Sequence, residues 1–324
     1  MKRREFITLF GGGAAAWTFS AHGQSQTMVL VGVLGSGFAR SSAILIDAFK
    51  KGMRDSGLIE DRNYVLDVRW AEGDYERFGT LASELAQRRP KVMVVTTIAA
   101  GLAARQAAPT TPIVMTGLID PVGAGLVTSL SRPGGNVTGI SSITQDTTVK
   151  ALELLRTVIP KLKTVAVLFN PLNPGNRLII RDLRNQAAAL QTTIHLIEFK
   201  TPDSLDGTIN SLGQDSALLV VGDAALIDLR EQIATLALRR RVPTATPIPE
   251  FTDVGGLIGY GPSRREIYRR AASYVKKILD GAKPADLPVE QPTLIELSIN
   301  MRTAKTLDIT IPDSLIARAD RVIE

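Results

Sequence analysis

The sequence predicts an α/β protein built from two doubly wound parallel-sheet lobes, joined by a hinge of several strands. The first observation is that short, continuous apolar runs alternate with amphipathic helical stretches, and such runs are typical of strands covered on both faces of a parallel sheet. The second is that this alternation stops at residues 118–139 and then begins again. The third is length, because 324 residues suffice for two domains of roughly 100–200 residues each.

The composition is that of an ordinary globular protein, with 44% hydrophobic and 22% charged residues. The formal charge of +6 comes from scattered basic residues, and only 5% of the residues are aromatic, so nucleic acid is not an expected partner. The chain contains no cysteine, which excludes disulfides, thiolate nucleophiles, cysteine-based metal sites and a lipid-modified cysteine.

Residues 1–23 have the three-part pattern of an export signal peptide. A positively charged start that includes Arg3 and Arg4 precedes an apolar run reaching Phe19, and small residues follow at Ala21 and Gly23. The paired arginines resemble a twin-arginine signal, and a Sec signal is the alternative. Because the apolar run is too short and too glycine-rich for a span of about 20 residues, the sequence predicts a periplasmic protein that is released from the membrane.

The first half of the chain predicts four strands separated by helices. The strands are expected at 28–34, 64–70, 92–96 and 113–116, and the helices from Ser41 or Ser42 onward, at 75–88 and at 98–108. Gly35 and Gly37 follow the first strand as in a dinucleotide-binding fingerprint, but Arg40 stands where the third glycine is needed. No nucleotide or other cofactor is therefore expected.

Residues 118–139 hold five glycines and two prolines, too many for the interior of a helix or strand. We expect a strand to end at Asp120, a short helix near 122–130, a turn at 132–136, and then a strand that leaves for the second lobe. This segment would be a hinge. The alternative is a glycine-rich surface loop inside one domain.

The second half repeats the pattern. Strands are expected at 137–140, 164–169, 194–199 and 217–221, and helices at 146–158, 177–190 and 226–240. Two further crossings between the lobes are expected, at 255–262 and near Gln291, with a helix at 264–280 between them. A strand at 293–299, a helix cap at Asn300 and a closing helix at 313–323 complete the prediction. Lobe one would comprise 28–139 plus 261–290, and lobe two 140–260 plus 291–324.

Several motifs, in this order along the chain, resemble those of one protein family. They are RWAEG at 69–73, DPVGAGLV at 120–127, SRPGGNVTG at 131–139, GGL at 255–257, YGP at 260–262 and GAKPADLPVEQP at 281–292. The chain resembles the tryptophan/tyrosine-type substrate-binding proteins of ABC transporters over essentially its whole length after the signal. The resemblance implies a type I periplasmic-binding-protein fold that delivers a small solute, an aromatic amino acid in characterised relatives, to a membrane permease.

Ligands of open α/β sheets gather beyond the carboxyl ends of the strands, so residues at these ends are candidate ligand contacts. The candidates are Ser36, Phe38, Thr96, Thr97, Asp120, Asn170, Asn173, Asp223, Glu250 and Tyr260.

Eight of the ten candidates, all except Asn170 and Asn173, suit one part of an amino-acid-like ligand. A carboxylate prefers helix N-termini and nearby hydroxyls, which favours Ser36, Thr96 and Thr97. Ser41 is a further candidate for this role, and the alternative is that it only caps its helix. An ammonium group prefers one of the three acidic residues, although Asp120 could instead order its own turn. The aromatic rings of Phe38 and Tyr260 could form the apolar walls of the site, as could those of Phe169 and Phe251.

Two other functional classes were compared with solute binding. A Ser-His-Asp hydrolase would have to use His195, which lies inside an expected strand. The sequence shows no metal-ligand cluster, so no catalytic residue and no metal site is predicted. A two-lobed ligand sensor for a membrane receptor shares the fold and is the main alternative. The expected protein is a monomeric, non-enzymatic solute-binding component of an ABC importer, with a small solute and a permease as partners.

Overall fold

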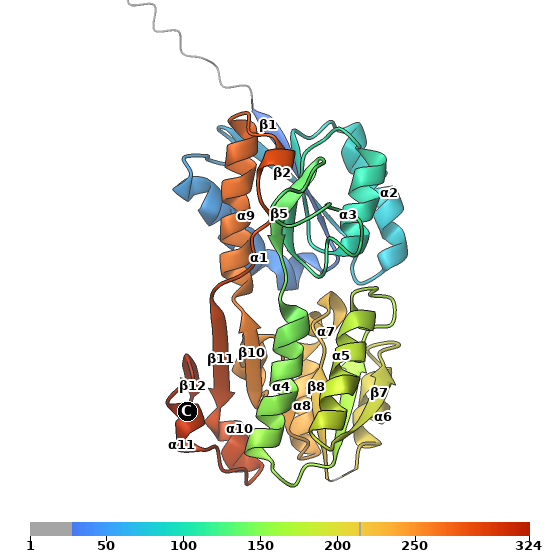
Figure 1. Cartoon of the computed structure of the whole chain (residues 1–324), viewed down its shortest axis with the longest axis vertical. Coiled ribbons are helices and arrows are strands. Elements are labelled where there is room, and N and C mark those ends of the chain that lie inside the picture. Colours follow the sequence, from blue (N-terminus) through green and yellow to red (C-terminus); the bar gives the residue numbers. More distant parts are fainter. Residues whose placement is uncertain (1–27, 214) are drawn as a thin grey trace, which may run out of the picture.

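The chain forms two sheets, which lie one beyond the other along the long axis of the molecule (Figure 1). The computed structural model describes residues 28–213 and 215–324, and the expected export signal at 1–23 lies outside them. We call the five-stranded sheet with its covering helices lobe one, and the seven-stranded sheet with its helices lobe two. This confirms the predicted fold class. Within the described ranges, no helix is both long and apolar enough to cross a membrane.

Lobe one has a wholly parallel sheet in the order β2-β1-β3-β4-β5. Its strands are β1 (Val29–Gly35), β2 (Tyr64–Trp70), β3 (Val92–Val95), β4 (Ile113–Leu118) and β5 (Val137–Ser141). Its helices are α1 (Ala39–Asp55), η1 (Tyr75–Arg77), α2 (Phe78–Gln87), α3 (Ile98–Ala107), α9 (Arg264–Leu279) and η3 (Pro284–Asp286). Val31 and Val33 pack with α1 and α9 on one face, and Leu34 packs with α2 and α3 on the other. Because both faces are covered, the central strands β1 and β3 consist of apolar residues and glycine, whereas the edge strand β2 also contains Asp67 and Arg69.

The glycine-rich segment is a loop of lobe one and not the hinge. β5 pairs in parallel with β4, so residues 119–136 join two neighbouring strands of one sheet. Between 122 and 130 the backbone makes turns and bends instead of the expected helix. A β-carbon at Gly139 would lie 2.5 Å from the backbone of Met115, and its φ of +122° also requires glycine. The expectation that the strand at 137–140 belongs to lobe two was therefore wrong.

Lobe two has the strand order β12-β11-β10-β9-β8-β6-β7, parallel except between β10 and β11. Its strands are β6 (Thr164–Phe169), β7 (Thr193–Glu198), β8 (Ser216–Val220), β9 (Thr244–Thr246), β10 (Ile258–Pro262), β11 (Ile295–Asn300) and β12 (Arg321–Ile323). Its helices are α4 (Thr144–Val158), α5 (Asn176–Ala189), α6 (Ser204–Asn210), α7 (Ala224–Asp228), α8 (Arg230–Arg239), η2 (Pro249–Val254), α10 (Met301–Thr306) and α11 (Asp313–Ile316). Alternate residues of β6 enter different cores, with Val165 and Val167 on one face and Ala166 and Leu168 on the other.

Two expected helices are divided in the structure. The stretch at 226–240 contains the end of α7 and all of α8, and the stretch at 313–323 is α11 followed by β12. β12 pairs with β11, and Asp320 fixes this pairing because its backbone N–H donates to the carbonyl oxygen of Leu297 at 2.9 Å. The cap expected at Asn300 is confirmed, since its Oδ1 accepts from the backbone N–H of Thr303 at 2.9 Å.

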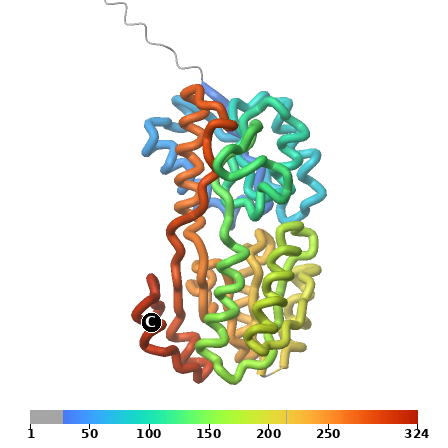
Figure 2. Tube along the Cα trace, viewed as in Figure 1, coloured from blue at the N-terminus to red at the C-terminus, as the bar shows by residue number. Residues whose placement is uncertain are grey.

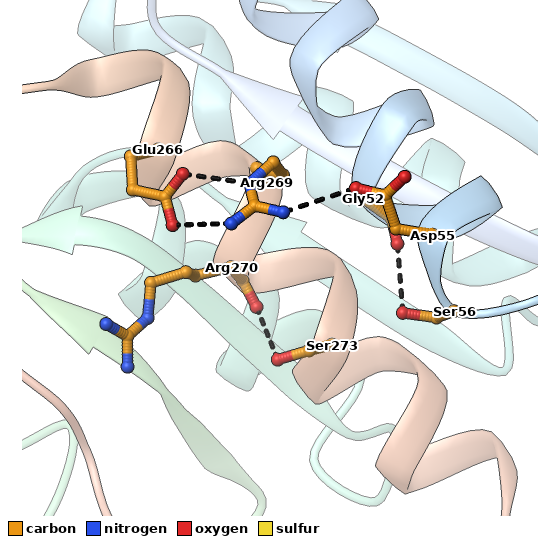
Figure 3. Close-up of polar contacts among 7 residues, drawn as sticks. All are labelled: Gly52, Asp55, Ser56, Glu266, Arg269, Arg270 and Ser273. Carbon is orange, nitrogen blue, oxygen red and sulfur yellow. Dashed lines mark hydrogen bonds and ion pairs between the residues drawn. The ribbon is translucent and has the colours of Figure 1, made fainter.

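Helix α9 returns from lobe two and packs against α1 of lobe one. The two helices approach so closely that a β-carbon at Gly52 would lie 2.2 Å from the carbonyl oxygen of Arg269. The guanidinium of Arg269 donates to both carboxylate oxygens of Glu266 and to Asp55 of α1 (Figure 3). This packing places the first turn of α9, which is distant in sequence, at the edge of the lobe-one sheet.

Three connections run between the lobes, as Figure 2 shows: β5 to α4, β10 to α9, and η3 to β11. The third is held on lobe one as far as Glu290, whose backbone N–H donates to the carbonyl oxygen of Gly139 at 3.0 Å and whose carboxylate pairs with Arg270. The lobe limits expected at 139/140, 260/261 and 290/291 stay predictions. The strands nearest the first two limits end at Ser141 and Pro262.

Candidate ligand-binding cavity

A cavity of about 150 Å³ lies between the lobes, at the edge where parallel strands of both sheets end. Lobe one lines it with hydroxyl and aromatic side chains, and lobe two lines it with amide, carboxylate and proline groups. The predicted site residues that line the cavity are Ser36, Thr96, Thr97, Asn173 and Asp223. Their meeting follows from the parallel topology, because it brings the carboxyl ends of distant strands to one edge.

Asp223, which directly precedes α7, is the most elaborately bonded side chain of the cavity wall and is only 3% exposed. Its Oδ1 accepts from Asn170 Nδ2 and from the backbone N–H of Ala225, both at 3.0 Å. Its Oδ2 accepts from Asn173 Nδ2 at 2.9 Å. These three donors belong to lobe two, so the position of the carboxylate does not depend on lobe one.

A fourth donor to Asp223 comes from lobe one. The hydroxyl of Tyr75 donates to Asp223 Oδ2 at 3.1 Å and thereby joins the two lobes across the cavity. Burial, and then the negative charge of Asp223, raise the pKa of Tyr75 well above its ordinary value. The phenol therefore stays protonated, and remains a donor, at any pH near neutrality.

The ring of Trp70, the last residue of β2, lines the lobe-one side of the cavity. It lies on Gly35, where a β-carbon would come within 2.1 Å of the indole, and near Gly37. Gly35, the last residue of β1, therefore has a packing role because it leaves room for an aromatic ring, whereas a β-carbon at Gly37 would lie 2.6 Å from Ser42 Oγ.

The hydroxyls of lobe one are partly committed to the protein itself. Thr97 caps α3, accepting from the backbone N–H of Ala100 at 3.2 Å, and Thr96 Oγ1 accepts from the backbone N–H of Ser36 at 3.1 Å. Neither Ser41 nor Ser42 caps helix α1. The N-cap residue is Phe38, and no side chain accepts a hydrogen bond from the first turn at that position. The expected role of Ser41 or Ser42 as a helix cap was therefore wrong, because α1 begins earlier than predicted.

Helix α9 adds two side chains that the sequence did not indicate, Arg264 and Tyr268. Burial raises the pKa of Tyr268, and the nearby positive charge of Arg264 opposes this shift. Arg264 is the first residue of α9 and makes no hydrogen bond or ion pair with any residue in the described ranges. It brings an unpaired guanidinium to the cavity wall.

Five predicted residues lie outside the cavity lining. Asp120 accepts from the backbone N–H of Gly123 at 2.8 Å and orders its own turn, while Asn170 supports Asp223 from behind. The others are Phe38 before α1, Glu250 in η2, and Tyr260 in β10, which packs against the core of lobe two. Phe169 and Phe251 are buried core residues. Ligand contact by each of the ten candidates stays a prediction.

The structure adds Trp70, Tyr75, Arg264 and Tyr268 to the candidates. Trp70 ends a strand, so the rule used for the other candidates could have found it. The two α9 residues lie in a helix that follows a strand of lobe two but packs on lobe one. No local pattern in the sequence indicates that arrangement.

Groups for metal binding or acid–base chemistry are scarce at the cavity. The described residues contain no cluster of three or more acidic or histidine side chains that could hold a metal ion. His195 is exposed on β7, an edge strand of lobe two, and does not line the cavity. The arrangement favours binding by charge, hydrogen bonds and aromatic contact.

Comparison with known proteins agrees with this geometry. The sequence profile described as ABC transporter substrate binding protein matches residues 38–323. A tyrosine-binding protein of Clostridioides difficile strain R20291 is 27% identical over 262 residues, covering 81% of this chain and 75% of that protein.

Solved structures share the fold. A conserved domain protein from Vibrio cholerae is 25% identical with a TM-score of 0.84, covering 91% of this chain and 99% of the other. A Streptococcus pneumonia ABC domain in complex with L-Trp is 24% identical with a TM-score of 0.81, covering 92% and 100%. A ligand-free, open substrate-binding protein from Clostridium difficile is 23% identical with a TM-score of 0.66, covering 92% and 99%. Because the matched profile extends over nearly all of the described residues, the protein belongs to the ABC transporter substrate-binding protein family.

Proposed function

We propose that the protein closes its two lobes on one small solute with an aromatic or large apolar group, of the amino-acid or aromatic-acid class. The observation that carries the proposal is a cavity to which both lobes contribute and which is lined by one acidic side chain, one basic side chain and aromatic rings. A ligand that contacts both lobes favours the closed form, because the open form lacks half of these contacts.

The comparisons support the aromatic class of ligand. One relative is named for tyrosine binding, and one similar structure holds L-Trp. The TM-score is 0.81 with that complex and 0.66 with the open, ligand-free structure, as expected if the lobes of this protein stand close together. The hydrogen bond from Tyr75 to Asp223 across the cavity supports the same arrangement.

The proposal includes delivery of the solute to a membrane permease by a monomeric, exported protein that does no chemistry on the solute. Export would depend on the signal at 1–23, by the twin-arginine or the Sec route. Neither nucleic acid nor a cofactor has a part in it.

A thermal-shift screen of the purified full chain tests the proposal. The panel would contain the aromatic amino acids, aromatic acids of similar size, aliphatic amino acids and pentoses. A true ligand at 100 times its dissociation constant adds about 2.7 kcal/mol to the free energy of unfolding. Trp70, the only tryptophan in the described ranges, supplies a second signal through its fluorescence. A response to pentoses alone, or to no member of the panel, would refute the proposal.

A further inference from the structure

The two charged side chains of the cavity differ in how far the protein itself satisfies them. Among the described residues that line the cavity, Asp223 is the only acidic and Arg264 the only basic side chain. An amino acid would use both, placing its ammonium on the carboxylate and its carboxylate on the guanidinium. The hydrogen bonds around each group therefore indicate which charges the ligand carries.

The Asp223 carboxylate has no acceptor position to spare. A carboxylate offers about four acceptor sites, and Asp223 receives four hydrogen bonds, two on each oxygen. Three donors are Asn170, Asn173 and the backbone of Ala225, all within lobe two. An incoming ammonium group would have to displace one of them or the Tyr75 hydroxyl.

Displacing Tyr75 carries its own penalty. Its hydroxyl lies in a region withdrawn from solvent, where burial and the Asp223 charge both favour the protonated form. If an ammonium group took its acceptor, this donor would lose its hydrogen bond to a charged group, which lowers the affinity of the ammonium ligand by about tenfold or more. The wall of lobe two is thus complete without a positively charged ligand.

Arg264 is in the opposite situation. A guanidinium keeps its charge at every physiological pH and offers five N–H donors. None of these donors is bonded to a residue in the described ranges. Arg264 is partly buried at the cavity wall, and a charge withdrawn from water is stabilised by a partner of opposite sign. The partner that the cavity lacks is therefore an anion.

We propose, on the basis of the solute-binding function above, that the ligand is an aromatic carboxylic acid without an α-ammonium group. Its carboxylate pairs with Arg264, its ring lies against the aromatic wall that includes Trp70, and Tyr75 retains its hydrogen bond to Asp223. Tyr75 thereby becomes a specificity-determining residue, because it occupies the acceptor position that an amino acid would need.

Matched ligand pairs test this inference on the purified full chain. Each pair keeps the ring and the carboxylate and differs only in the α-ammonium group: tryptophan with indole-3-propionate, tyrosine with 3-(4-hydroxyphenyl)propionate, and phenylalanine with 3-phenylpropionate. Titration calorimetry should give at least about tenfold tighter binding for the propionate of the preferred pair, the factor expected for one hydrogen bond to a charged group. Tighter binding of the amino acid would overturn the inference and leave the proposed function intact. Failure of all six compounds to bind would also overturn the inference, and the wider thermal-shift panel would then decide whether the proposed function stands.

Two variants locate the effect. Arg264→Gln should weaken propionate binding by about tenfold or more, whereas Arg265→Gln, an exposed neighbour on the same helix, should not. Tyr75→Phe should move the preference toward the amino acid by freeing an acceptor of Asp223, whereas Tyr64→Phe, in the core of lobe one and outside the cavity lining, should leave it unchanged. Unchanged propionate binding by Arg264→Gln, or an unchanged preference in Tyr75→Phe, would contradict the inference. If either variant fails to fold, the wild-type comparison still decides.

Discussion

The two halves of the cavity wall are held in place by different physical means. In lobe two, Asp223 is fixed by three hydrogen bonds from its own lobe. In lobe one, the ring of Trp70 has its place because Gly35 has no side chain. The lobe-two wall is therefore set by hydrogen bonding and the lobe-one wall by packing, so the two should fail under different substitutions.

The largest effect is expected from filling the space behind Trp70. In Gly35→Ala, the new β-carbon would overlap an indole ring, which cannot give way as a flexible chain end can. We expect a loss of about 3 kcal/mol in the free energy of unfolding, measured by urea denaturation, together with altered Trp70 fluorescence. The matched control is Gly222→Ala at a strand end of lobe two, where the nearest atom is a methyl of Thr144 at 3.2 Å. Equal stabilities for the two variants would remove the contrast between the walls.

Hydrogen bonding in lobe two is tested by Asn170→Ala. This side chain is 3% exposed; it donates to Asp223 and accepts from the backbone N–H of Leu172 at 3.0 Å. Its removal leaves buried groups without partners, so we expect a loss of about 2 kcal/mol by the same measurement. Asn210→Ala, which removes an exposed bond to Asp206, should cost about 0.5 kcal/mol or less. A similar loss in both variants would mean that burial of the amide is irrelevant.

The hydrogen bond between Tyr75 and Asp223, which joins the two walls, should influence closure more than stability. Tyr75→Phe removes the cross-lobe hydrogen bond and keeps the ring. A net contribution of at least about 1.5 kcal/mol, for a hydrogen bond to a charged group, implies a shift of roughly tenfold or more of the ligand-free population toward the open form. Small-angle scattering, or energy transfer between one dye on each lobe, would measure this shift. An unchanged distribution would show that closure does not depend on this contact.

The fold was predictable where the determining pattern is local. Apolar runs such as 164–169 are strands because both of their faces are covered, and that property is visible in the residues themselves. The errors occur where a distant strand decides the outcome. β5 joins lobe one through pairing with β4, and β12 forms because β11 lies beside it. A glycine-rich stretch indicates a break in regular structure, but it does not say which sheet continues afterwards.

The cavity could be predicted only in part, for the same reason. Ser36, Thr96 and Asp223 end or follow strands, so the topology rule places them at the correct edge. The rule does not distinguish side chains that line the cavity from those that only support a lining residue, such as Asn170. It also cannot find Arg264, because α9 follows a strand of lobe two in the sequence but packs on lobe one. These distinctions depend on tertiary packing.

The smallest effect is expected from alkaline pH, and it again distinguishes lobe one from lobe two. The tyrosines with raised pKa values all belong to lobe one: Tyr64, to about 12, and Tyr75, Tyr268 and Tyr274, with burial the largest cause in each case. A raised folded-state pKa means that the stabilisation is fully present below the unfolded value of about 10 and is lost as the pH rises through the folded value. The bond from Tyr75 to Asp223 should therefore persist up to pH 10. Tyrosinate absorbance should rise equally in the wild type and in Tyr75→Phe up to that pH, and should differ by one tyrosine only after unfolding in urea. A difference between the folded proteins below pH 10 would place the Tyr75 hydroxyl in solvent, outside the contact between the lobes.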